Sequence, residues 1–224
     1  MRILITAAEE EEIITAKQAY NSLGLNHRSN IEIEFMLTGI GTTSTTYRLT
    51  KELSSKPPYD LAINIGIAGS FSPEFPIGSV ARINREFFGD LGFETFSGFQ
   101  TLFDYKILDE NTHPFINGAL VSPKLNIKIE EAINDIPLAT SVTVQTVSGL
   151  PEKKEQLIKG FTPQIESMEG AAFFYVCLLE KVPFIELRSV SNEVGERDRT
   201  KWDIPLAIES LKDGVKRLLI GICS

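Results

Sequence analysis

The sequence predicts a layered α/β fold with a central, largely parallel sheet. Short apolar runs, typical of buried strands, alternate along the chain with longer segments of helical periodicity. The chain has 224 residues, of which 42% are hydrophobic, and this is enough for one sizeable core. It contains no internal repeat, low-complexity stretch or linker. We therefore expect one domain that spans residues 1–224.

Strand and helix alternate regularly in the first third of the chain. The expected strands are residues 3–7, 31–37 and 61–65, and the expected helices are residues 9–23 and 42–53. Gly24 follows the first helix and Pro57-Pro58 follows the second, and both are typical of helix ends. The glycine-containing segment 66–70 is expected to form a turn after the third strand.

The middle third is less regular, and the last third is clear again. The expected strands are residues 80–88, 141–147, 164–168 and 184–190, and the expected helices are residues 125–133, 169–180 and 202–220. Residues 89–105 are rich in glycine and phenylalanine, which favours a loop or lid.

The charge balance excludes several classes of partner. A net charge of −8, from 22 basic and 30 acidic side chains, disfavours contact with DNA, RNA or an anionic membrane surface. The chain begins with a strand-like run at residues 1–5, and no apolar run is long enough to span a bilayer. We expect a cytoplasmic protein without a targeting leader, with no nucleic-acid or membrane partner.

The cysteines and histidines offer no disulfide framework or metal site. Cys177 and Cys223 are far apart in the sequence, and Cys177 lies in an apolar run typical of a buried, inert thiol. His27 and His113 have no other ligand-type residue at metal spacing. We therefore expect neither a metal nor another cofactor.

Two candidate segments follow expected strands in the first third. The glutamates at 9–12 follow the first strand, and carboxylates there suit the positive end of a helix dipole. One of them at the carboxyl edge of the sheet, where ligands bind in α/β folds, is also suited to act as a general base on water. Segment 66–70 is either a plain tight turn or a place where backbone approaches a ligand closely. It lacks the Gly-Lys-Ser/Thr ending of a phosphate-binding loop.

Two further candidates lie in the last third. Met168 and Glu169 stand at a strand-to-helix junction, and a carboxylate there is either a helix N-terminal acid or an acceptor for two neighbouring ribose hydroxyls. Arg188 and Asn192 stand in and after the next strand. An asparagine there is either a turn residue or a side chain that donates to and accepts from a flat heterocycle.

Taken in order, these four segments resemble the purine nucleoside phosphorylase/nucleosidase superfamily, and most closely its methylthioadenosine/S-adenosylhomocysteine nucleosidase branch. That branch has a glutamate-rich segment after the first strand, then Gly-x-Ala-Gly, Met-Glu and Arg-x-x-Ser-Asp, over nearly the whole chain. The resemblance implies a three-layer α/β/α nucleoside phosphorylase-like fold, a purine nucleoside substrate and a homodimer or higher homo-oligomer.

The resemblance also implies a role for each matching residue. Glu12 matches the base that activates water, Met168 and Glu169 match the ribose-binding pair, and Arg188 is expected to support Glu169. The remaining residues expected to bind substrate are Ala68, Gly69, Thr146 and Val147, the last two near the segment that lines the base pocket.

Asn192 departs from the adenine-specific pattern, in which the general acid is an aspartate. A 6-oxopurine presents acceptors at both N7 and O6, so a carboxylate facing O6 would be repelled, whereas an amide can donate to either atom. Asn192 therefore favours an inosine-like or guanosine-like base. An amide is no proton donor comparable to a carboxylic acid, so it is expected to stabilise charge on the departing base, and N7 would be protonated by solvent or another group.

A second departure concerns the nucleophile. Ile67 stands where the nucleosidases often carry serine, and the glutamates at 9–12 would repel phosphate, so water is favoured over phosphate. One branch combines these traits, because the futalosine hydrolases resemble this chain in length, in the early glutamate and in the run from Arg188 to Arg199 with Trp202. Futalosine carries hypoxanthine and a 5′ benzoate, for which Arg197 and Arg199 are candidate contacts.

The branch resemblance implies hydrolysis of futalosine to hypoxanthine and dehypoxanthine futalosine in menaquinone biosynthesis. The aromatic segment from Phe87 to Phe103 is expected to contribute to the pocket for the 5′ tail. The alternatives are a methylthioadenosine- or aminodeoxyfutalosine-type adenine nucleosidase, an inosine/guanosine phosphorylase, and a non-catalytic nucleoside-binding domain.

Overall fold

The computed structural model describes residues 1–24, 31–96 and 98–223, so the expectation for His27 lies outside the described residues. The strands are β1 (Arg2–Ala7), β2 (Glu32–Leu37), β3 (Leu61–Ser70), β4 (Val80–Phe88), β5 (Gly92–Thr95), β6 (Gly98–Thr101), β7 (Leu120–Val121), β8 (Leu138–Thr143), β9 (Ile165–Ser167) and β10 (Phe184–Glu193). The helices are α1 (Glu10–Ser22), α2 (Gly41–Ser55), α3 (Ile127–Ile133), α4 (Pro151–Phe161), α5 (Gly170–Leu179) and α6 (Ile204–Cys223), with a 3₁₀ turn at Arg199–Lys201.

The central sheet is mixed and largely parallel, as the sequence predicts. Its strand order is β10-β4-β8-β9-β3-β1-β2, and β7 pairs with β4. Because β10 also pairs with β3, five strands close into a ring from which β1 and β2 extend. The β1–β2, β1–β3, β3–β10, β4–β8 and β8–β9 pairs are parallel, whereas β4–β10, β3–β9 and β4–β7 are antiparallel.

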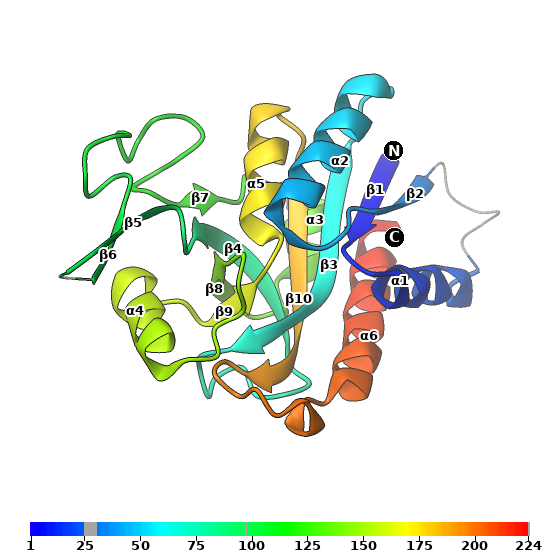
Figure 1. Cartoon of the computed structure of the whole chain (residues 1–224). Coiled ribbons are helices and arrows are strands. Elements are labelled where there is room, and N and C mark those ends of the chain that lie inside the picture. Colours follow the sequence, from blue (N-terminus) through cyan, green and yellow to red (C-terminus); the bar gives the residue numbers. More distant parts are fainter. Residues whose placement is uncertain (25–30, 97, 224) are drawn as a thin grey trace.

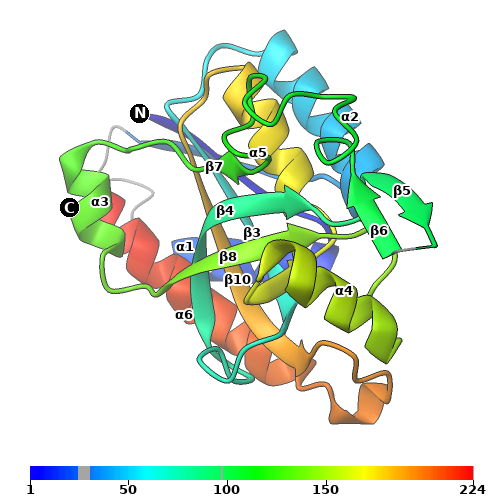
Figure 2. The ribbon, with the colours of Figure 1, turned by 90° about the vertical axis from the view of Figure 1, so that its left-hand side faces the viewer.

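Helices cover the sheet on two sides, which confirms the three-layer α/β/α arrangement (Figures 1 and 2). Helices α2 and α5 pack on one side, with Leu49, Phe173 and Phe174 in a buried apolar cluster. Helices α1, α3 and α6 pack on the other side, in a second cluster that contains Ile63 and Leu218. Burial of apolar side chains on both faces explains why the central strands are nearly continuous apolar runs.

The expected turn at 66–70 is wrong, because β3 continues to Ser70. The small residues in this half of the strand pair with β10 on one side, where Arg188 lies opposite Gly66, and with β9 on the other, where Glu166 lies opposite Gly69. Pairing on both sides overrides the local turn preference of glycine. The extension carries the strand to the edge of the sheet, and Ile67 is its only bulky side chain.

Other boundaries also differ from the sequence expectations. The expected loop at 89–105 contains the β5–β6 hairpin, β8 ends at Thr143 rather than at residue 147, and β10 runs to Glu193. The last helix begins at Ile204 instead of residue 202, after the 3₁₀ turn. Helix α4 was not expected, although Pro151 at its first turn is a typical start signal.

Candidate functional site

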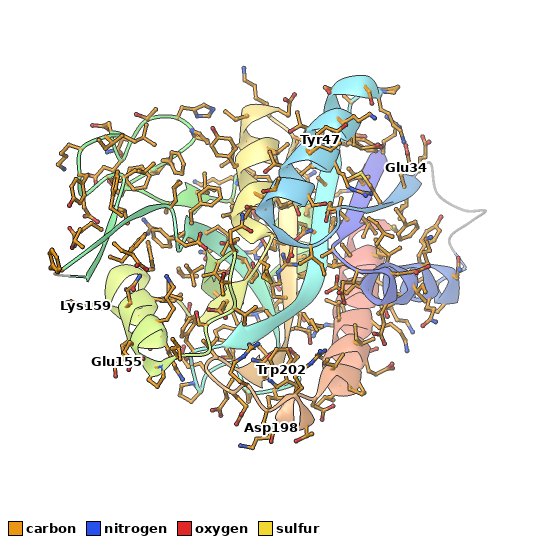
Figure 3. All side chains as sticks on the ribbon, viewed as in Figure 1. Glu34, Tyr47, Glu155, Lys159, Asp198 and Trp202 are labelled. Atoms are coloured by element: carbon orange, nitrogen blue, oxygen red, sulfur yellow. The ribbon has the colours of Figure 1, made fainter. Side chains whose placement is uncertain are left out.

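A cavity of about 230 Å³ lies where β3, β9 and β10 end and α1 and α5 begin. Its walls include Glu12, Glu169 and Asn192, which come from three distant parts of the sequence. Trp202, which follows β10, also lines it, and Figure 3 shows Trp202 beside the ends of β3 and β10. Carboxyl ends of neighbouring parallel strands meet at one edge, so the fold itself brings these residues together.

Glu12 is held rigidly at the floor of the cavity. It belongs to the first turn of α1 and is 6% exposed, whereas the other three glutamates of the cluster are exposed. Its Oε1 accepts the Ile67 N–H at 3.0 Å and its Oε2 accepts the Glu9 N–H at 3.1 Å. Burial raises the pKa of Glu12, although these two N–H groups and the charge of Arg188 oppose the rise. Among the four glutamates, Glu12 has the geometry of a fixed base.

Arg188 lies beneath the same spot, buried to 1% exposure. Its Nη2 is 2.9 Å from Glu186 Oε1 and also donates to Asn64 Oδ1. A Cβ added at Gly66 would lie 2.8 Å from Arg188 Nη1 and 3.0 Å from Glu12 Oε1, so both groups converge over Gly66. A glycine is therefore required here, because any side chain would collide with both the cation and the carboxylate.

Glu169 is oriented by the start of α2. Its Oε1 accepts the Gly41 N–H at 2.9 Å, and Gly41 has a φ of 84°, which favours glycine. Its Oε2 has no hydrogen-bond partner among the described residues. Met168 lines the cavity beside it. One carboxylate oxygen is thus fixed by the backbone, and the other is available to a ligand hydroxyl.

Asn192 is 5% exposed and its amide is oriented by its neighbours. Its Oδ1 accepts the Ser191 hydroxyl at 2.9 Å, and its Nδ2 donates to the Glu193 carbonyl at 2.9 Å. An amide has two N–H groups, and the second has no partner among the described residues. Nδ2 lies 3.3 Å from the position of a Cβ at Gly69. A free donor is therefore held at the cavity wall above Gly69.

A further carboxylate, that of Glu166, lines the same cavity. It is 4% exposed, and its Oε1 accepts the Ser148 N–H at 3.1 Å. Its Oε2 is buried without a hydrogen-bond partner. Burial raises the pKa of Glu166, and the Ser148 hydrogen bonds and the charges of Arg197 and Lys153 oppose the rise.

Below the cavity, Glu86 and Glu186 form a fully buried pair of carboxyl groups. A Cβ at Gly170 would overlap Glu86 Oε1 and lie 2.6 Å from Glu186 Oε1, so the two groups meet under the start of α5. Burial raises the pKa of Glu186 to about 7. The pKa of Glu86 is also raised, by burial and then by the charge of Glu186. Like charges this close favour one shared proton, and the pair faces Arg188.

The structure brings most of the expected site residues to one cavity. Glu12, Ala68, Gly69, Val147, Met168, Glu169 and Asn192 line it. Thr146 is exposed next to Val147 and is not among the lining residues. Arg188 lies below the cavity, where it contacts Asn64 and Glu186, although Glu169 is near enough to act on its charge.

The two arginines considered for a benzoate contact both stack on Trp202, with Arg197 at 5.6 Å and Arg199 at 5.8 Å from the ring centroid. Of the two, Arg199 lines the cavity. Trp202 is anchored by a 3.0 Å hydrogen bond from its ring N–H to the Glu196 carbonyl.

Sequence reasoning missed three buried carboxyl groups. Glu86 lies in β4 and Glu186 lies in β10, where both side chains are fully buried, and Glu166 is the only charged residue of its three-residue strand. A charge inside a buried strand is costly unless it is paired or functional, and this was the available signal. In the described part of the chain, no group of three His, Cys, Asp or Glu residues has a metal-binding arrangement, and no helix has the length and apolarity of a membrane span.

Comparison with known proteins assigns this fold to a family. The chain belongs to the phosphorylase superfamily, whose family model matches residues 31–220. The futalosine hydrolase of Streptomyces coelicolor is 31% identical, covering 97% of this chain and 95% of that protein. The futalosine hydrolase of Thermus thermophilus is 29% identical, covering 83% and 80%.

Among solved structures, a futalosine hydrolase from Helicobacter pylori has a TM-score of 0.78 at 20% identity, covering 98% of this chain and 97% of that chain. This likeness concerns the fold. The resemblance to the superfamily and to its futalosine hydrolase branch is thus confirmed.

Proposed function

We propose that this protein hydrolyses the N-glycosidic bond of futalosine, releasing hypoxanthine and dehypoxanthine futalosine, as a step of menaquinone biosynthesis. The support is 31% identity to a futalosine hydrolase over nearly the whole length of both chains. The choice of base rests on one observation, the free amide N–H that Asn192 holds at the cavity wall. An aspartate at the same position would suit adenine. A donor there matches the acceptors N7 and O6 of hypoxanthine.

In the proposed reaction, Glu12 accepts the proton of a water that attacks the anomeric carbon. We place that water above Gly66, within reach of Glu12, which lines the cavity, and of Arg188 beneath it. A carboxylate fixed by two backbone N–H groups needs no reorganisation when the proton arrives, and its raised pKa makes it a better base than an ordinary glutamate.

Glu169 and Met168 hold the ribose. The free Oε2 of Glu169 accepts a ribose hydroxyl, while the Gly41 N–H keeps Oε1 in place. As the glycosidic bond breaks, the sugar becomes oxocarbenium-like and positive, so nearby carboxylates stabilise it more than they stabilise the ground state. Asn192 stabilises the opposite charge that builds on the base.

The 5′ tail is proposed to run along the outer wall of the cavity. That wall contains Ile40, Trp202 and Ile204, with Arg199 stacked on the indole ring. Apolar side chains suit the aromatic ring of a benzoate, and a guanidinium suits its carboxylate. Arg199 is therefore the candidate tail contact.

The test is to incubate the protein with futalosine, aminodeoxyfutalosine, inosine and methylthioadenosine without phosphate, and to identify the released base by chromatography. We expect hypoxanthine from futalosine at the highest kcat/KM. Adenine released from methylthioadenosine at a matching rate would contradict the base assignment and favour an adenine nucleosidase. A strict requirement for phosphate would favour a phosphorylase, and binding without turnover would favour a non-catalytic domain.

We also propose that two copies of the chain form a homodimer. A separate apolar groove of about 1320 Å³ lies between α2, α5 and the segment after β4, lined by Tyr47, Phe88 and Phe115 among others. Tyr47 projects from α2 and is 67% exposed (Figure 3). Light scattering is expected to give twice the chain mass of 24.9 kDa, and Tyr47→Asp to lower it toward one chain.

A further inference from the structure

We propose that Glu166 is a specificity-determining residue that accepts a hydrogen bond from N1–H of a 6-oxopurine, beside Asn192, which donates to O6 or N7. The inference rests on the proposed function for the identity of the base. Glu166 does not belong to the sequence motifs described above. The proposal gives this chain a second contact to the base, in addition to that of Asn192.

The sheet places Glu166 and Asn192 on either side of one glycine. Gly69 in β3 pairs with Asn192 of β10 on one side and with Glu166 of β9 on the other. Residues opposite each other on neighbouring strands extend their side chains to the same face, so both polar groups border the space that Gly69 leaves open. Two strand spacings separate their Cα atoms by about 10 Å, a gap that the two side chains and one purine edge fill.

The carboxylate of Glu166 is fixed and incompletely partnered. Its Oε1 is bound to the Ser148 N–H at 3.1 Å, and its Oε2 is buried without a partner on the wall of the cavity. A buried acceptor without a partner costs free energy, so a ligand donor at that place is stabilising. The N1–H of a bound 6-oxopurine would supply such a donor.

Charges around Glu166 favour the carboxylate over the acid. Arg197 and Lys153 are near enough to stabilise the ionised form, and Ser148 donates to it. Burial opposes them and raises the pKa. An N1–H bond to Oε2 adds a second donor to the ionised form, so the bound base itself stabilises the carboxylate.

Hypoxanthine and adenine present opposite patterns to this pair of residues. The 6-oxo base offers O6 as an acceptor and N1–H as a donor side by side, which matches an amide donor and a carboxylate acceptor. The 6-amino base offers an acceptor at N1 and a donor at position 6, so the Glu166 contact would be mismatched, and so would an Asn192 contact made to position 6. Such a site rejects the wrong base because its buried polar groups are left unpaired.

Glu166→Gln inverts this preference for a structural reason. The Ser148 N–H needs an acceptor, so the glutamine oxygen takes the place of Oε1 and the amide NH₂ takes the place of Oε2. The base then meets a donor instead of an acceptor. That donor opposes N1–H of hypoxanthine and complements N1 of adenine.

The experiment measures binding of free hypoxanthine, adenine and 1-methylhypoxanthine by calorimetry to the full-length wild type and Glu166→Gln. We expect the wild type to prefer hypoxanthine over both other bases. Loss of a hydrogen bond to a charged group corresponds to a weakening of hypoxanthine binding by about 10- to 100-fold in the variant, with adenine binding unchanged or tighter. Glu155→Gln, an exposed residue of α4 labelled in Figure 3, is the matched control and should bind like the wild type.

Three outcomes would overturn the proposal. The first is that 1-methylhypoxanthine binds the wild type as tightly as hypoxanthine does, and the second is that Glu166→Gln leaves hypoxanthine binding unchanged. The third is that Glu166→Gln weakens the binding of hypoxanthine and of adenine equally, which is the result expected from a purely structural role of Glu166. Free bases lack the ribose and tail, so the result is separate from the test of the proposed function. If the protein binds hypoxanthine in this manner but leaves futalosine intact, the proposed substrate fails and the base contact stands.

Discussion

Gly66→Ala adds a single methyl group at the point where the proposed base and the buried arginine converge. The new Cβ would lie 2.8 Å from Arg188 Nη1 and 3.0 Å from Glu12 Oε1. Neither neighbour is free to move, because Arg188 is bound to Glu186 and Asn64, and Glu12 is bound to two backbone N–H groups. The methyl group also occupies the space proposed for the attacking water.

The size of the effect follows from these distances. Ordinary contact begins at 3.4 Å, so Arg188 Nη1 has to retreat by about 0.6 Å and Glu12 Oε1 by about 0.4 Å. Misplacement of a reacting group by about 1 Å costs roughly 10²-fold in rate, so these shifts predict a loss of about 10- to 100-fold in kcat. Overpacking of a buried site costs about 1–3 kcal/mol of unfolding free energy.

The assay is hypoxanthine release from futalosine under saturating conditions, with urea unfolding of the same samples. Gly160→Ala is the matched control, because a Cβ at Gly160 in α4 meets no atom within 4 Å. Alanine in that helix is expected to stabilise the protein by about 0.5–1 kcal/mol and to leave kcat unchanged. A Gly66→Ala variant that folds and keeps the wild-type kcat would refute the placement of water over Gly66.

Three further substitutions test other parts of the site. Glu12→Gln should still bind hypoxanthine but lose about 10²- to 10⁴-fold in kcat, since an amide accepts no proton; full activity would mean that another group is the base. Asn192→Asp should lower kcat/KM for futalosine relative to aminodeoxyfutalosine by about 10-fold or more, because a carboxylate repels O6; an unchanged ratio would contradict the role of the amide. Glu186 has a pKa of about 7 when folded, above the ordinary glutamate value of 4.5, so the folded state binds its proton more tightly. Stability from this group is therefore present at low pH and is lost as the pH rises from 4.5 to 7. Between pH 4.5 and 8 the unfolding free energy of the wild type should fall by about 3 kcal/mol relative to Glu186→Gln, measured by urea titration, and a constant difference would contradict the raised pKa.

The layers of the fold were predictable because local patterns coincide with tertiary packing. The run Leu61–Ile65 is apolar at every position except Asn64, and both faces of β3 are in fact covered by helices. The second half of β3 was not predictable from local preference. Whether Gly66 and Gly69 form a turn or a strand depends on β9 and β10, which lie about a hundred residues further along the chain.

In the site, too, some residues could be grouped from local sequence patterns, whereas others are brought together only by tertiary pairing. Glu12, Glu169 and Asn192 follow strands or begin helices, so the general rule that ligands bind at the carboxyl edge was enough to group them. Glu86 and Glu186 meet only because β4 and β10 are neighbours in the closed sheet and Gly170 leaves space above them. Strand pairing of this kind is set by the whole chain, and no spacing in the sequence encodes it.

Electrostatics give a further reason why water, and not phosphate, is the expected nucleophile. The buried cation below the cavity, Arg188, faces the carboxyl groups of Glu186, Glu169, Glu12 and Glu86. Its positive charge is thus compensated before any ligand binds, and a phosphate beside Glu12 would meet more negative than positive charge. A neutral water meets no such repulsion and gains an acceptor at Glu12 and a donor at Arg188. The same excess of carboxylates stabilises the positive sugar of the transition state, so one charge distribution excludes phosphate and favours hydrolysis.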